Sequence, residues 1–409
     1  MTRHPAAKTE EEALNPPSMS HGALFLRFLR FGATAFGGPV AQIAMIRHEL
    51  VEQERWISGP RFNRLLAVMQ ALPGPEAHEL CVHLGIRAKG RVGGLLAGLG
   101  FMLPGFILMM LAAWAWFRFE VNGAWAAPAL LGAQAAVVAL IVRAVHRIGG
   151  HILIDRGLWI IGLTASAATL AAAPFWVVLP AGAAVHVLAC SGRRGAAAIL
   201  LALAIISLIL WIAFGHVPEA VAPFATLARG GGAETLGLFV AGLKGGLLTF
   251  GGAYTAIPFI RQDLVGRGWI SDGDFLDGVA LANVLPAPLI IFATFAGYAA
   301  GGFTGALTIT AGVFLPAFAF SMIFYDRLEA VVADARIRAA LDGVAAAVVG
   351  VIGATVIGLA QVLLSPGAAL WPIAVAVGAL LALYVVKGRY APPAVLIAAA
   401  AAGMALGST

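Results

Sequence analysis

Phe36-Gly37-Gly38 is repeated in the second half of this chain as Phe250-Gly251-Gly252. Residues near the two copies also match, and these pairs are Ile46-Arg47 with Ile260-Arg261, Trp56-Ile57-Ser58 with Trp269-Ile270-Ser271, and Phe62 with Phe275. Each copy continues into a Pro-x-Pro step, Pro73-Gly74-Pro75 and Pro286-Ala287-Pro288. A duplicated domain with Gly and Pro in apolar segments is typical of membrane transporters, whose two pseudo-symmetric halves enclose a site near the bilayer midplane.

The composition is that of a membrane protein. The chain is 61% hydrophobic and 11% charged, whereas an ordinary soluble domain has roughly 25% charged residues. Apolar stretches such as Val92–Phe117 and Ala196–Phe214 are long enough for a hydrocarbon core of about 30 Å, which takes roughly 20 helical residues. The 50 glycines fit the close helix packing of small residues in lipid. We therefore expect a polytopic all-α protein in a lipid bilayer.

Several other classes are disfavoured by the same sequence. The first 22 residues are polar and lack the apolar core of a signal peptide, so we expect a short cytoplasmic tail. Cys81 and Cys190 lie in apolar contexts, which argues against a disulfide framework or a cysteine metal site. The net charge of +6 comes from basic residues in short loops, so membrane orientation explains it better than nucleic acid does. No cofactor is expected.

The apolar segments divide the chain into two equivalent halves. We expect a tail over 1–22, a first transporter repeat over 23–192, a connecting helix and linker over 193–233, and a second repeat over 234–409. About 13 membrane segments, some of them broken or re-entrant, are expected near 24–46, 61–86, 92–118, 125–146, 154–172, 174–190, 195–214, 236–260, 274–300, 302–325, 336–363, 368–386 and 391–407.

An odd number of crossings separates equivalent points, which predicts an inverted repeat. With the N-terminus in the cytoplasm, most loops rich in Arg and Lys fall on the cytoplasmic side, as the positive-inside rule requires. One loop disagrees, because it would place four arginines outside: Arg47, Arg55, Arg61 and Arg64. Either this loop is an exception, or the segment before it is re-entrant.

Two cations lie at corresponding positions of the repeats. Arg30 precedes Phe36, and Lys244 precedes Phe250, by the same number of residues within apolar helices. Charges in a membrane segment are costly and usually face a cavity or a partner. We therefore expect Arg30 and Lys244 to form a shared anion site. The alternative is that their long side chains reach the membrane interface.

The Gly and Pro steps are expected to interrupt helices and to bind substrate. They comprise Gly37, Gly38, Gly251 and Gly252, and Pro73, Gly74, Pro75, Pro286 and Pro288. Broken helices in membranes are tolerated where the freed backbone lines a cavity, and the N-terminus of a resumed helix favours anions. Gln70 and Asn283 precede the two Pro-x-Pro steps by three residues and could hold oxyanion oxygens through their amides. The alternative is that these residues only kink packed helices.

The two copies differ after the Pro-x-Pro step. The first continues with Glu76, His78, Glu79 and His83, whereas the second has Leu289, Ile290 and Ile291. Glu and His exchange protons when burial perturbs them, so the first set is the candidate for proton coupling. The alternative is a solvated helix end at the interface.

The same stretch is similar to a metalloenzyme motif. His78-Glu79-Leu80-Cys81-Val82-His83 approaches the zinc-protease pattern H-E-x-x-H, but the second histidine comes one residue late. An i, i+5 pair places the two rings roughly 140° apart around a helix. The sequence therefore predicts no metal site and no enzyme, and an intramembrane metalloenzyme is the least favoured alternative.

The combination of the Phe-Gly-Gly, Ile-Arg and Trp-Ile-Ser motifs with Leu72-Pro73-Gly74-Pro75-Glu76 resembles the chromate ion transporter family, and the resemblance covers nearly the whole chain. It implies an inner-membrane carrier of chromate, with sulfate as an analogue, that gives chromate resistance by efflux. It also implies coupling to the membrane potential or proton gradient. Ala287 stands where the first copy has Gly74, which predicts a stiffer second break. An anion channel or a sulfate carrier of the same fold remains an alternative, and a homodimer is compatible with this architecture.

Overall fold

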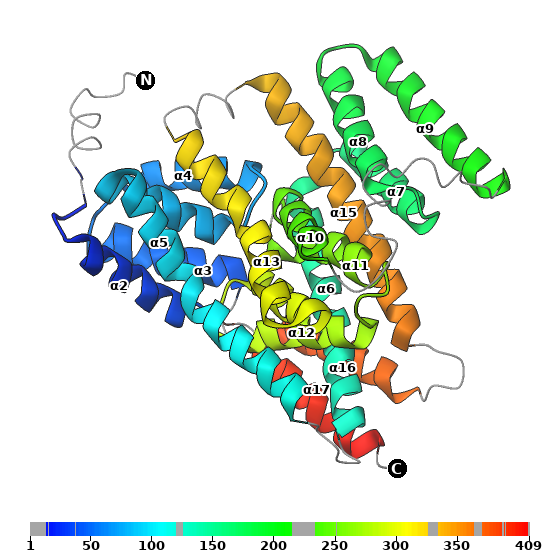
Figure 1. Ribbon diagram of the computed structural model, residues 1–409. Helices are drawn as coiled ribbons and strands as arrows, with labels where there is room; N and C mark the ends of the chain where they lie inside the picture. The colour runs from blue at the N-terminus through cyan, green and yellow to red at the C-terminus, as the bar shows by residue number, and fades with distance from the viewer. Residues whose placement is uncertain are drawn as a thin grey trace.

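The computed structural model describes residues 14, 16–36, 38–119, 126–214, 234–250, 252–325, 334–363, 370–386, 388 and 390–407, and all regular elements there are helices (Figure 1). The first repeat contains α2 (His21–Ala33), α3 (Gly38–Arg47), the π-helix η1 (His48–Gln53), α4 (Gly59–Ala71), α5 (Glu76–Arg118), α6 (Ala126–Ile152), α7 (Arg156–Leu170) and α8 (Phe175–Cys190). The second contains α10 (Thr235–Leu247), η4 (Ala253–Ala256), α11 (Ile257–Leu264), α12 (Asp272–Val284), η5 (Leu289–Ile291), α13 (Phe292–Ile323), α15 (Ala335–Leu363), α16 (Trp371–Val385) and α17 (Ala391–Gly407). Between them lies α9 (Arg194–Phe214), which has no counterpart.

Several helices match a membrane environment. Four stretches in the described part of the chain are long and apolar enough to cross a bilayer, namely Glu76–Arg118, Ala126–Ile152, Leu289–Ile323 and Ala335–Gln361. Shorter apolar helices, including α8, α16 and α17, accompany them. The expectation of an all-α, multi-pass membrane protein is therefore confirmed. The total of 13 segments stays a prediction, because the shorter helices do not by themselves establish a crossing.

Four breaks interrupt the helices where the Gly and Pro steps predicted them. In the first repeat we name residues 34–36 the first Gly break and residues 72–75 the first Pro break. In the second repeat, residues 248–250 and 252 are the second Gly break, and residues 285–288 are the second Pro break. Gly37 and Gly251, two of the expected site residues, lie outside the described residues. The expected span 24–46 is thus two short helices, and the 10 residues of α3 cover only about 15 Å, as a re-entrant segment would.

The long helices that follow the two Pro breaks, α5 and α13, are hairpins rather than straight rods. α5 reverses at Lys89-Gly90 and α13 at Gly301-Gly302, and Gly90 and Gly302 have φ of 63° and 62°. Left-handed backbone of this kind favours glycine, which lacks a Cβ atom. The limbs then pack so closely that a Cβ atom on Gly85 would lie 2.5 Å from the carbonyl oxygen of Gly93. The hairpin tips coincide with the boundaries expected between 61–86 and 92–118 and between 274–300 and 302–325.

The long limbs of the two hairpins pack against each other in opposite directions. Near the tip of the first hairpin, a Cβ atom on Gly98 would lie 2.4 Å from the Phe318 ring, near the end of the second. At the far end of the first hairpin's long limb, Phe117 stacks on Tyr298, which lies in the short limb beside the tip of the second hairpin, with ring centroids 5.9 Å apart. Equivalent limbs are therefore antiparallel, which is the relation expected when the pseudo-two-fold axis lies in the membrane plane.

Each repeat completes the packing of the other. α6 packs against α16 and α17 of the second repeat, and α15 packs against α7 and α8 of the first (Figure 1). The α6–α17 crossing is close enough that a Cβ atom on Gly132 would lie 2.2 Å from the carbonyl oxygen of Ala399. Small residues that let backbones approach are the usual means of helix association in lipid, where burial of apolar surface gives little advantage.

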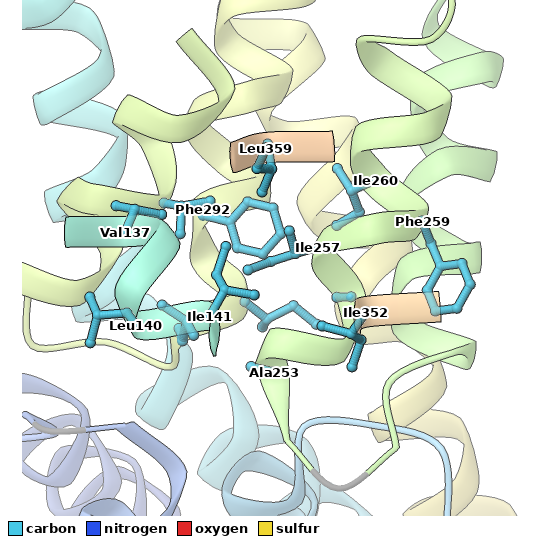
Figure 2. Packing of buried hydrophobic residues seen from close by; sticks show 14 of the residues in the cluster. Val137, Leu140, Ile141, Ala253, Ile257, Phe259, Ile260, Phe292, Ile352 and Leu359 are labelled. Atoms are coloured by element: carbon cyan, nitrogen blue, oxygen red, sulfur yellow. The ribbon is translucent and has the colours of Figure 1, made fainter. Parts of the chain in front are cut away.

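An apolar core joins the repeats beside the breaks. Figure 2 shows Val137 and Ile141 of α6, Ile257 and Ile260 of α11, Phe292 of α13, and Ile352 and Leu359 of α15 packed together. The labelled side chains come from both repeats and from elements far apart in sequence. This core fixes the position of α6 against the second repeat, and Leu140 of the same helix reaches from the core to the cavity described next.

Candidate functional site

All four breaks border one cavity of about 1080 Å³. Residues from or beside each break face it, namely Gly38, Pro39, Gln70, Glu76, Phe250, Gly252, Asn283, Leu285, Ala287 and Leu289. The cavity continues along α6 to Ile154 and Asp155, beyond the end of that helix. It therefore runs from the breaks toward one end of the helix bundle. Pro73, Gly74, Pro75, Pro286 and Pro288 build the breaks without lining the cavity themselves.

Hydrogen bonds tie each Pro break to the Gly break of the other repeat. The backbone N–H of Gly74 donates to the carbonyl oxygen of Thr249 at 2.8 Å. At the equivalent crossing, the amide Nε2 of Gln42 donates to the carbonyl oxygens of Ala35 and Ala287 at 3.1 and 3.0 Å. Gln42 is 1% exposed, so its amide holds two buried carbonyl groups that would otherwise be costly to leave unpaired.

Two arginines on α6 line the cavity. Arg143 and Arg147 are four residues apart, which places both side chains on one face of the helix. Neither forms an ion pair with an acidic side chain in the part of the chain that the structure describes. Arg147 interacts electrostatically with Glu76, and both arginines interact with Tyr254. Two cations with spare donors thus face the same space as the breaks.

Acidic residues at the far end of the cavity already have partners. The carboxylate of Asp155 caps α7 by accepting the backbone N–H of Leu158 at 2.9 Å. Asp342 interacts electrostatically with His186 and Arg338. These contacts leave the guanidinium groups of Arg143 and Arg147 available to an anion.

Neutral polar groups complete the lining near the breaks. Gln70 is exposed to the cavity. The side-chain oxygen of its counterpart Asn283 accepts a hydrogen bond from the Tyr254 hydroxyl at 2.8 Å, and the Asn283 amide nitrogen donates to the carbonyl oxygen of Val279 at 2.9 Å. The expected pair of amides therefore lies in one cavity. The Gln70 amide is the one offered to a ligand, because the Asn283 amide is held by protein groups.

The four residues expected to couple protons occupy three different environments. Glu76 lines the cavity. His78 and Glu79 are completely buried, and the His78 ring packs against Phe314 and Phe318 with centroids 5.0 and 4.7 Å away. His83 stacks on Tyr325 with centroids 4.4 Å apart, outside the cavity lining. The structure therefore brings Glu76 and Glu79 to the break and leaves His83 away from it.

Arg30 and Lys244 do not line this cavity. Lys244 donates to both carboxylate oxygens of Asp263, at 2.7 and 2.6 Å, and Arg267 contacts the same carboxylate at 3.3 Å. Arg30 is exposed, and its neighbour Arg27 pairs with Glu54. The two matched cations are thus placed differently, and their role as a shared anion site stays a prediction.

No group of three or more His, Cys, Asp or Glu side chains suited to a metal ion occurs among the described residues. In particular, His78 and His83 belong to separate side-chain clusters, with Phe314 and with Tyr325.

The arrangement is suited to holding an anion that carries more than one charge. Arg143 and Arg147 supply two positive charges, and charge-assisted hydrogen bonds of this kind are the strong ones. α3 and α5 begin at the cavity with Gly38 and Glu76, and helix N-termini carry partial positive charge. The sequence analysis missed Arg143 and Arg147 because it counted both among the cytoplasmic loop charges at the end of the segment 125–146. Their i, i+4 spacing was the signal that could have identified them.

Known proteins resemble the chain over most of its length. The family model described as "Chromate transporter" matches residues 22–188 and again 236–404. A chromate transport protein of Pseudomonas aeruginosa is 63% identical over 347 residues, which are 85% of this chain and 83% of that protein. A chromate transport protein of Cupriavidus metallidurans is 31% identical, and a probable one of Synechococcus elongatus is 28% identical; each alignment covers 84% of this chain, and 84% and 86% of those proteins. No solved structure matches.

Proposed function

Because the chain belongs to the chromate transporter family, we propose that it carries chromate through the membrane by alternating access at the cavity between its repeats. The observation that supports this most directly is that all four breaks border one cavity, which is lined by two arginines that form no ion pair in the described part of the chain. Transporters of other folds place substrate at such discontinuous helices between repeats.

Charge, rather than shape, is the proposed basis of recognition. A cavity of about 1080 Å³ is far larger than one tetrahedral oxyanion, so close packing cannot select it. Arg143 and Arg147 offset the two charges of chromate, and the Gln70 amide and the backbone at Gly38 and Gly252 provide further polar contacts. Sulfate has the same charge and shape, and we propose it as an analogue that competes for the site.

The orientation and direction of transport belong to the same proposal. The antiparallel hairpin limbs and the loop charges support an inverted repeat with the N-terminus in the cytoplasm, in a bacterial inner membrane. Moving a charge across the membrane involves about 2.3 kcal/mol per 100 mV. A dianion therefore leaves an interior-negative cell with the potential, which favours export and chromate resistance, with the proton gradient as a second driving force.

A flux measurement in liposomes tests the proposed function. Purified protein is reconstituted, and entry of radiolabelled chromate is followed under an imposed potential or pH gradient, with protein-free liposomes as the control. Saturable chromate flux that sulfate inhibits is expected, because both dianions require the same compensation by Arg143 and Arg147. Absence of flux for both anions under either gradient would overturn the proposal, and single-channel currents would identify a channel instead.

A further inference from the structure

Glu79 is a buried acid that the anion site leaves unexplained. Its side chain is 0% exposed, and neither carboxyl oxygen has a hydrogen-bond partner among the described residues. An isolated carboxylate in such a place costs many kcal/mol, so the group takes up a proton instead. In this conformation Glu79 is therefore the neutral acid.

The position of Glu79 connects it to both the cavity and the break. A Cβ atom on Gly74 would lie 2.2 Å from Oε1 of Glu79, so the carboxyl group rests against the first Pro break. The N–H of Gly74 in turn holds Thr249 of the other repeat. Glu76, which lines the cavity, lies three residues earlier on the same helix face.

The groups around Glu79 indicate one route by which its proton reaches the cavity. Glu76 acts on it electrostatically, and Arg147 of α6 acts on Glu76. From α13, the Ser321 hydroxyl donates to the backbone carbonyl of Glu79 at 3.4 Å, and Phe314 and Phe318 pack on the adjacent His78. Glu76 is therefore the titratable group between Glu79 and the cavity.

Building on the proposed transport function, we propose that Glu79 is the proton-binding site of the transport cycle and exchanges its proton with the cavity through Glu76. In this step the Glu79 O–H bond breaks, the Glu76 carboxylate accepts the proton, and Glu76 then releases it to the cavity. The second repeat has Leu289, Ile290 and Ile291 after its Pro break, so one such site operates per molecule. His83 takes no part.

The test compares wild type with Glu79→Gln in liposomes, with the potential clamped at zero. Two quantities are measured: exchange of labelled chromate at equal concentrations, and net accumulation driven by a pH gradient. One coupled proton gives about a tenfold accumulation ratio per pH unit. Glu79→Gln is expected to keep exchange, because the amide preserves shape and neutrality, and to lose the response to the pH gradient. Glu52→Gln, an exposed carboxylate variant on η1, is the matched control.

A second measurement on the wild-type protein covers the case in which the variant does not fold. A hydrophobic carbodiimide modifies protonated carboxyl groups in apolar surroundings, and peptide mass spectrometry locates the adduct. Modification of Glu79 that declines as pH rises is expected. A pH gradient that drives Glu79→Gln as it drives wild type, or modification that is independent of pH, would overturn the proposal. Absence of chromate flux in wild type would instead count against the transport function, because the carbodiimide result does not depend on it.

Discussion

The two repeats share their backbone and differ in their charges. Both have a Gly break, a Pro break and a hairpin that reverses at a glycine with nearly the same φ, at Gly90 and Gly302. By contrast, the first repeat has Arg143 and Arg147 in the last part of α6 and carboxyl groups after its Pro break, whereas α15 has arginines only in its first turn, Arg336 and Arg338, and no charged residue from 343 to 363. The matched breaks therefore border the cavity, whereas three charged residues that line it, Arg143, Arg147 and Glu76, have no charged counterpart in the second repeat.

The same contrast separates the matched pair Arg30 and Lys244. Lys244 is held by Asp263, while Arg30 is exposed. Equivalent positions in a repeat thus indicate equivalent places on the backbone, but they do not establish equivalent interactions. In this molecule the cations that reach the cavity come from α6, a position with no charged counterpart in the second repeat.

The largest expected effect is on Arg143 and Arg147. Replacing either by Gln removes charge-assisted hydrogen bonds worth about 1.5–3 kcal/mol. The apparent KM for chromate should therefore rise about ten- to a hundredfold, measured as flux in liposomes. Arg194→Gln, at the exposed start of α9, is the control and should leave KM unchanged. Wild-type KM in both cavity variants would show that charge in the first repeat does not select the anion.

A smaller effect is expected from exchanging residues between the two Pro breaks. Gly74 has φ of +152°, and a Cβ atom there would meet Glu79, so Gly74→Ala should cost roughly 1–3 kcal/mol and lower both transport and thermal stability. Ala287→Gly is the matched change at the second Pro break and should cost about 0.5–1 kcal/mol. Equal losses of stability in the two variants would mean that the breaks are interchangeable.

The smallest effect on transport is expected from the Lys244–Asp263 pair. If the pair is structural, Lys244→Gln and Asp263→Asn should each lower the unfolding temperature. The double variant should lower it by less than the sum of the two single decreases, because the effects of substituting residues in contact are not additive. The double variant should then retain transport. Loss of transport in the double variant, and also in Arg30→Gln, would instead support the shared anion site at Arg30 and Lys244.

Much of the fold could be predicted because its determinants are local. Gly38, Pro75 and their counterparts mark the breaks by their own backbone restrictions, and the duplication is visible as repeated letters. The site was harder, because it depends on where helices end and on distant contacts. Arg143 and Arg147 lie at the end of the predicted segment 125–146, where basic residues are naturally taken as charges of the cytoplasmic loop. Lys244 reads as an unpaired cation until α11 brings Asp263 beside it.

The exchanged packing of α6 and α15 has a consequence for how the protein is made. When the first repeat has been synthesised, α7 and α8 lack α15, and α6 lacks α16 and α17. The apolar faces of these helices stay without their partners until later, because the partners lie far along the chain and such non-local contacts form late. Neither half can complete its own packing. The final packing of either half therefore requires that the whole chain has been synthesised, and a chain that ends within the second repeat leaves apolar helix faces of the first repeat without their partners.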